Sequence, residues 1–147
     1  MTNVHPTAIV EDGAELGDGV EIGAYSIIGP TVTIGAGTRI HPHVVVDGKT
    51  TIGEGCNFFP FSCVGTQTQD LKFSGGDTFV EIGDRTTLRE YVTVNSGTNE
   101  GEITRVGSDC TILAYCHVAH ACKVGNEVIM SNGATLAGDV IVEDQAI

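Results

Sequence analysis

The stretch from Val106 to Val124, VGSDCTILAYCHVAHACKV, carries an aliphatic residue at every sixth position, including Ile112 and Val118. Outward from this stretch, the same phase continues along almost the whole chain. It passes through Val4, Val10, Leu16, Ile22, Ile28, Ile34, Ile40, Val46, Ile52, Phe58, Val64, Ile82, Leu88, Val94, Met130, Leu136 and Val142. Neither the 3.6-residue period of a helix nor the two-residue period of a strand produces this spacing. A fixed hexad predicts an all-β solenoid whose coils each have three short flat faces, a parallel β-helix.

Two other positions of the hexad support this architecture. The residue after the aliphatic is often glycine, as at Gly17, Gly35 and Gly107, and we expect it to supply the sharp turn at each corner of the coil. The residue two places before the aliphatic is often small, which suits a narrow, filled prism. Because three hexads make one coil, residues eighteen apart are predicted to stack on neighbouring coils about 4.8 Å apart.

Length and charge limit the possible functions. The chain has 147 residues and a formal net charge of −12 at pH 7. This length predicts a single domain spanning residues 1–147. The negative charge disfavours nucleic acid and anionic membrane surfaces as partners, and no apolar run is long enough to cross a membrane. We therefore expect a soluble cytoplasmic protein that does not insert into membranes.

Most cysteines and histidines fit the repeat without a chemical role. Four of the five cysteines occupy the small-residue position of the hexad: Cys56, Cys110, Cys116 and Cys122. No CxxC pair occurs, so we interpret these four as small buried hydrophobic residues. Cys63 lies outside this position. His5, His41 and His43 lie in ordinary hexads and are expected at the surface or at corners.

The repeat is interrupted twice. Its phase breaks at Asp70, Gly76 and Glu100, within two polar, glycine-rich segments, residues 66–79 and 96–104. We predict that both segments protrude from the solenoid as loops. Surface loops on a rigid scaffold often carry function, although tolerated insertions without a function would have the same composition.

Two further histidines, His117 and His120, lie in the segment CHVAHAC beyond both loops. One coil on from His120 comes Gly138, so regular coils would place the two residues side by side. A neutral imidazole beside a glycine N–H offers a general base next to an oxyanion donor. This pairing suits acyl transfer, and the alternative is an exposed histidine with no catalytic role.

Longer motifs indicate a family. The chain contains VHPTAIVE (4–11), QDLKFSG (69–75), VEIGDR (80–85), LREYVTV (88–94), VGSD (106–109), CHVAHAC (116–122) and NGATLAGDV (132–140). Through these motifs it resembles the acyl-[acyl-carrier-protein]–UDP-N-acetylglucosamine O-acyltransferases of lipid A biosynthesis. The hexads alone would indicate only the broad hexapeptide-repeat superfamily. The QDLK segment together with HVAH at this separation is much more specific to this family.

The resemblance implies a left-handed parallel β-helix that assembles as a homotrimer with active sites between subunits. It also implies a reaction, the first step of lipid A biosynthesis. An R-3-hydroxyacyl chain would move from acyl carrier protein to the 3-hydroxyl of UDP-N-acetylglucosamine. No cofactor or metal is expected, because a thioester is already activated.

The resemblance also assigns roles to residues. His120 would take the proton from the sugar hydroxyl, and the backbone amide of Gly138 would stabilise the oxyanion. Four further residues would hold the substrates: Gln69, Asp70, Lys72 and His117.

This chain departs from the family pattern at specific points. Ala121 stands where the family usually has an aspartate, so a group that could orient the imidazole is missing. Asp139 replaces a histidine, and Ser96 replaces a basic residue. The family also continues for several more coils and a helical C-terminal domain, so we interpret this chain as a fragment or a short homologue.

Three alternatives remain at this point. A non-catalytic trimeric scaffold or a UDP-sugar-binding remnant fits Ala121, Asp139 and the short length. A metalloenzyme of the trimeric β-helical carbonic anhydrase kind would need a third ligand beside His117 and His120. A relative that acylates an amino group is a further possibility, although the QDLK segment favours O-acylation.

Overall fold

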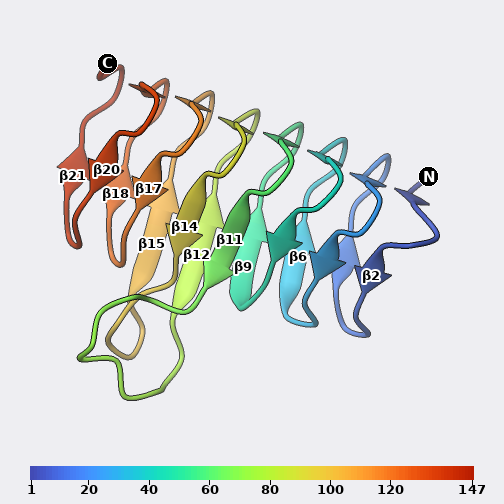
Figure 1. Ribbon diagram of the computed structural model, residues 1–147, viewed down its shortest axis with the longest axis horizontal. Helices are drawn as coiled ribbons and strands as arrows, with labels where there is room; N and C mark the ends of the chain where they lie inside the picture. The colour runs from blue at the N-terminus through green and yellow to red at the C-terminus, as the bar shows by residue number, and fades with distance from the viewer.

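A computed structural model describes residues 1–147, and it consists of short strands and turns without helices. The strands form three parallel sheets of seven strands each. The chain winds through the three sheets in turn as a left-handed parallel β-helix, with its termini at opposite ends (Figure 1). The predicted fold class is therefore confirmed. The structure contains no helix with the length and apolarity needed to span a membrane.

We name the three sheets A, B and C. Sheet A contains β1 (Asn3–Val4), β4 (Glu21–Ile22), β7 (Arg39–Ile40), β10 (Asn57–Phe58), β13 (Thr87–Leu88), β16 (Thr111–Ile112) and β19 (Ile129–Met130). Sheet B contains β2 (Ile9–Val10), β5 (Ile27–Ile28), β8 (Val45–Val46), β11 (Cys63–Thr66), β14 (Thr93–Asn95), β17 (His117–Val118) and β20 (Thr135–Leu136). Sheet C contains β3 (Glu15–Leu16), β6 (Val32–Ile34), β9 (Lys49–Ile52), β12 (Phe79–Ile82), β15 (Ile103–Val106), β18 (Lys123–Val124) and β21 (Ile141–Val142).

The register between coils follows the hexads. Val4 pairs with Ile22, and Ile22 with Ile40, so aliphatic residues of successive coils lie directly above one another. The aliphatic side chains point inward and form one continuous core with the residues two places before them. Ile28 and Val118 have no exposed surface. The four cysteines of the small-residue position are buried as predicted, and Cys63 is half-buried.

The glycines that follow the aliphatic residues do not make the turns, contrary to our expectation. The left-handed backbone lies two positions later, for example at Gly37 (φ 73°) and Tyr25 (φ 61°). Gly35 is needed for a different reason, because a Cβ atom there would lie 2.6 Å from the carbonyl carbon of Gly53 in the next coil. Close approach of neighbouring coils therefore selects glycine at this position. Gly65 is an exception, with a φ of 86° within β11, just before the chain leaves the solenoid.

Both predicted loops leave the solenoid at the corner between sheets B and C. The first excursion, residues 67–78, connects β11 to β12, and the second, residues 96–102, connects β14 to β15. Figure 1 shows the two excursions projecting from the same edge of the molecule. They are one coil apart, and hydrogen bonds join them directly, including one between the hydroxyl oxygens of Thr68 and Thr98.

A column of aromatic side chains lines the corner between sheets A and B. Tyr25, His43, Phe61, Tyr91 and Tyr115 occupy the left-handed position of five successive coils. Their rings stack with centroids 5.0–5.2 Å apart. Stacking of neighbouring rings helps to offset the cost of left-handed backbone at bulky residues. The expected corner position of His43 is therefore confirmed.

Candidate active site

His120 lies in the turn that follows β17, at the corner between sheets B and C. The backbone N–H of Asp139 donates to the His120 carbonyl oxygen at 3.0 Å, so Gly138 lies on the adjacent coil. A Cβ atom at Gly138 would overlap the imidazole of His120, and only glycine leaves room for the ring. The Gly138 N–H donates to no group within the chain. The structure thus brings together the two residues that the eighteen-residue spacing predicts to be neighbours.

Two carboxylates face the His120 ring although residue 121 is an alanine. Asp70 Oδ2 lies 3.5 Å from His120 Nε2, and Asp139 Oδ2 lies 3.9 Å from the same atom. The Asp70 side chain is only 20% exposed, whereas that of Asp139 is 74% exposed. The imidazole therefore has a partly buried carboxylate neighbour, supplied by the first excursion. Ala121 itself has a left-handed backbone, and its N–H donates to the Thr104 hydroxyl.

His117 is a half-buried side chain on the outer face of sheet B. Its Nδ1 lies 2.6 Å from the hydroxyl oxygen of Thr93, the residue paired with it on β14. Burial lowers the pKa of His117, and the nearby His120 lowers it further. His117 is consequently a neutral imidazole near pH 7, suited to hydrogen bonding with a substrate.

The first excursion holds Asp70 in a defined orientation. The Lys72 backbone N–H donates to Asp70 Oδ1 at 3.0 Å, and the Asp70 N–H donates to the Thr68 hydroxyl at 3.1 Å. The hydrogen bond from Lys72 is the main cause of the lowered pKa of Asp70. Gln69 lies beside Asp70 and lines the same pocket. The Lys72 side chain is exposed and does not line this pocket, so a substrate contact by its ammonium group stays a prediction.

Four of the predicted site residues border an open pocket of about 410 Å³. Its lining consists of Gln69, Asp70, Asn95, His117, Ala119, His120, Thr135, Leu136 and Ala137. Our sequence interpretation omitted five of these, because four of them flank ordinary aliphatic positions of β14, β17 and β20 and the fifth, Leu136, is such a position itself. Asn95 is 4% exposed, and its Oδ1 has no hydrogen-bond partner within the chain. An unpaired polar atom beside a pocket is a feature that only the structure reveals.

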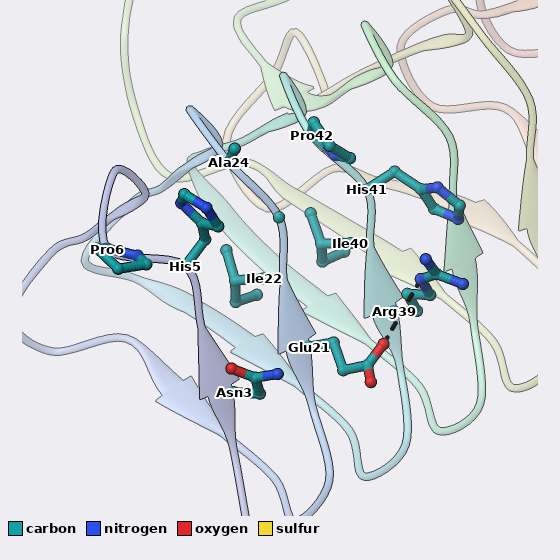
Figure 2. Close-up of a pocket in the computed structure, with 11 residues that line it drawn as sticks. Asn3, His5, Pro6, Glu21, Ile22, Ala24, Arg39, Ile40, His41 and Pro42 are labelled. Atoms are coloured by element: carbon teal, nitrogen blue, oxygen red, sulfur yellow. Dashed lines mark ion pairs between the residues drawn. The ribbon is translucent and has the colours of Figure 1, made fainter.

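A second depression, of about 430 Å³, lies on the outer face of sheet A near the N-terminal end (Figure 2). Figure 2 shows Glu21 and Arg39 facing each other across β4 and β7, and their ion pair of 3.5 Å offsets the charge there. His5 and His41 flank the depression, and His41 Nε2 is engaged by Asn57 Oδ1 at 2.6 Å. Because its charged groups are already paired, we favour the pocket at His120 as the functional site.

The pocket at His120 combines a base with a free peptide N–H. An imidazole can accept a proton from an attacking hydroxyl, and an unpaired N–H next to it can stabilise a developing oxyanion. No group of three or more His, Cys, Asp or Glu side chains is arranged to hold a metal ion. The arrangement suits acyl transfer from an activated donor.

Comparisons with known proteins indicate the family of this chain. Residues 103–147 match the family model described as bacterial transferase hexapeptide, six repeats. The acyl-[acyl-carrier-protein]–UDP-N-acetylglucosamine O-acyltransferase of Herminiimonas arsenicoxydans is 52% identical over 98% of this chain. The solved structure of LpxA from Acinetobacter baumannii superposes with a TM-score of 0.94 at 43% identity over 96% of this chain.

The chain belongs to the acyl-[acyl-carrier-protein]–UDP-N-acetylglucosamine O-acyltransferase family. The UDP-N-acetylglucosamine acyltransferase from Campylobacter jejuni, with a TM-score of 0.88 and 42% identity over 95% of this chain, has the same fold. The chain spans 55% of the length of the Herminiimonas relative, 55% of the Acinetobacter structure and 54% of the Campylobacter structure.

Proposed function

We propose that this chain carries the catalytic pocket of an O-acyltransferase. The enzyme would move an R-3-hydroxyacyl chain from acyl carrier protein to the 3-hydroxyl of UDP-N-acetylglucosamine, the first step of lipid A biosynthesis. The observation that carries this proposal is the contact between the His120 imidazole and Gly138 on the adjacent coil. Membership of the family supports it further.

In the proposed reaction, the 3-hydroxyl oxygen attacks the thioester carbonyl carbon while His120 accepts the hydroxyl proton. The negative charge that forms on the carbonyl oxygen is stabilised by the Gly138 N–H. The C–S bond then breaks, and the thiol of the carrier leaves with the proton held by His120. An ester forms and a thiol is released, so the chemistry needs no cofactor.

The remaining predicted residues would bind the substrates. Asp70 and Gln69 lie on the first excursion at the pocket edge, where they can accept or donate hydrogen bonds to sugar hydroxyls. His117 is held neutral by burial and can act as a hydrogen-bond partner without adding charge. Lys72 lies close by, where its ammonium could reach a phosphate of the donor or acceptor.

The proposal includes a homotrimer in the cytoplasm. Supporting it, the outer face of sheet B carries a column of apolar side chains: Ile9, Ile27, Val45 and Cys63. Ile9 is 54% exposed and Ile27 is 40% exposed. The same column continues through Thr93 to His117, so a subunit packed on this face would also border the pocket. We call this set of four residues the sheet B strip.

An acyl-transfer assay tests the function. The wild-type chain should convert UDP-N-acetylglucosamine to its 3-O-acyl product with R-3-hydroxyacyl carrier protein as donor. His120→Ala should reduce turnover at least about 100-fold, because it removes the general base. His5→Ala, at an exposed histidine far from the pocket, is the control and should keep wild-type turnover. Equal turnover of the wild type and His120→Ala would exclude His120 as the base.

A non-catalytic sugar-binding remnant is the second candidate. The observation that favours it is Asp139, whose carboxylate lies 3.9 Å from His120 Nε2 and brings negative charge toward the pocket. This candidate predicts that UDP-N-acetylglucosamine binds but no product forms with any acyl donor. Asp139→His would then be expected to create or raise transfer activity.

A further inference from the structure

The second excursion contacts the first one both at its base, beside the solenoid, and at its outer tip. Near the solenoid, the Thr68 and Thr98 hydroxyl oxygens lie 3.2 Å apart, and both residues are at most 5% exposed. At the outer end, the Asp77 N–H donates to Glu100 Oε2 at 2.6 Å, and the Gly101 N–H donates to the Asp77 carbonyl at 2.7 Å. The first excursion is therefore hydrogen-bonded to the shorter second excursion and does not extend freely into solvent.

Glu102 closes the second excursion on itself. Its Oε2 accepts the Thr98 N–H at 2.8 Å, and its Oε1 accepts from the Asn99 side-chain amide at 2.6 Å. Its backbone carbonyl also accepts the Phe79 N–H at 2.9 Å, where the first excursion returns to sheet C. The backbone of Thr98 is thus fixed by a hydrogen bond, which orients its hydroxyl toward Thr68.

A short series of contacts leads from Thr98 to the pocket. Thr68 accepts the Asp70 N–H, and Asp70 faces His120 Nε2 at 3.5 Å. The Thr98 hydroxyl also contributes to the lowered pKa of Asp70, after the hydrogen bond from Lys72. Without such contacts, an excursion containing Gly75 and Gly76 would sample many conformations, and ordering it on substrate binding would weaken affinity.

We propose that the second excursion is a brace and that Thr98 is a positioning residue, which fixes Asp70 at the mouth of the pocket through Thr68. The effect of this brace on substrate affinity rests on the proposed role of Asp70 in binding the acceptor sugar. The effect of the brace on the position of Asp70 is independent of that role. Sequence offered no sign of it, because neither excursion has a repeat.

Thr98→Val tests the brace, since it removes the hydroxyl and keeps the shape. Three measurements are made on the full chain: the pKa of Asp70 by NMR titration, amide hydrogen exchange over residues 67–73, and the Kd for UDP-N-acetylglucosamine. We expect the pKa of Asp70 to rise, exchange to accelerate, and Kd to increase about fivefold, as for loss of one buried hydrogen bond. Thr98→Ser should restore wild-type values.

Thr38→Val is the matched control. Thr38 is also buried, at the corner between sheets C and A rather than at the corner that carries the excursions. Its hydroxyl donates to the Gly53 carbonyl at 2.8 Å and accepts the Cys56 N–H at 3.0 Å. Thr38→Val should lower thermal stability as Thr98→Val does, without changing the Asp70 pKa, the exchange rates or the Kd.

An unchanged Asp70 pKa and unchanged amide exchange in Thr98→Val would overturn the brace. Absence of UDP-N-acetylglucosamine binding by the wild type would instead overturn the proposed function, and the other two measurements would still decide the brace.

Discussion

At the residue scale, the pocket depends on a few side chains and on the groups that face them. His120 lies between the small residue Gly138 and the carboxylates of Asp70 and Asp139. His117, on β17 three residues before His120, contacts Thr93 on the neighbouring strand β14 and is partly removed from water. Burial keeps His117 neutral near pH 7, so it can form a hydrogen bond without adding charge to the pocket.

Stability should depend on pH through His117. Because burial lowers its pKa, the folded chain binds a proton at this site less readily than the unfolded chain. The free energy of unfolding should therefore fall as pH drops below about 6.5, by up to about 1.4 kcal/mol per pH unit, and level off below the folded pKa. Urea denaturation at several pH values measures this slope. His117→Gln should reduce it, and an identical slope in the variant would contradict this explanation.

At the element scale, each coil is placed by a side chain that fills the prism and a glycine that lets the next coil approach. The turn itself tolerates many residues, since Tyr25, Phe61 and Arg85 all adopt the left-handed backbone. Glycines directly after the aliphatic residue therefore allow close packing of coils, whereas glycines two positions later adopt the left-handed backbone of the turn.

Alanine substitutions can separate these two roles. Gly35→Ala should lower the free energy of unfolding by about 3 kcal/mol, because its Cβ would overlap the backbone of the next coil. Gly37→Ala should cost only about 1 kcal/mol, the strain of a left-handed backbone, because its nearest contact would be 4.0 Å away. Denaturant unfolding of both variants measures the difference. The reverse order would show instead that the glycine directly after the aliphatic residue is the one needed for the turn.

The coils could be predicted from the sequence because every hexad places an aliphatic side chain in the core in the same way. The sequence predicted His120 beside Gly138 for the same reason, since eighteen residues make one regular coil. Contacts inside the excursions follow no period, so the approach of Asp70 to His120 and the pairing of Thr68 with Thr98 could not be derived. Asn95 was also missed, because its position in the hexad resembles that of any other residue after an aliphatic.

At the scale of the whole molecule, the three sheets present different surfaces. Sheet B exposes the apolar sheet B strip, and the pocket lies farther along the same face. Exposed apolar patches of this kind commonly mark protein–protein contacts. The proposed trimer would cover the strip and complete the wall of the pocket.

A charged substitution in the strip tests this assembly. Ile27→Glu should convert the trimer into monomers in analytical ultracentrifugation, because a carboxylate would be buried without a partner. Ile129→Glu is the matched control, at an isoleucine of similar exposure on sheet A. A wild-type monomer, or a trimer that persists in Ile27→Glu, would show that subunits do not associate through the strip.

A structure of the protein with UDP-N-acetylglucosamine tests the central claim most directly. We expect the sugar to occupy the pocket bordered by Asp70 and His117, with its 3-hydroxyl oxygen within hydrogen-bonding distance of a ring nitrogen of His120. A sugar bound elsewhere on the solenoid, or one whose 3-hydroxyl points away from His120, would contradict it.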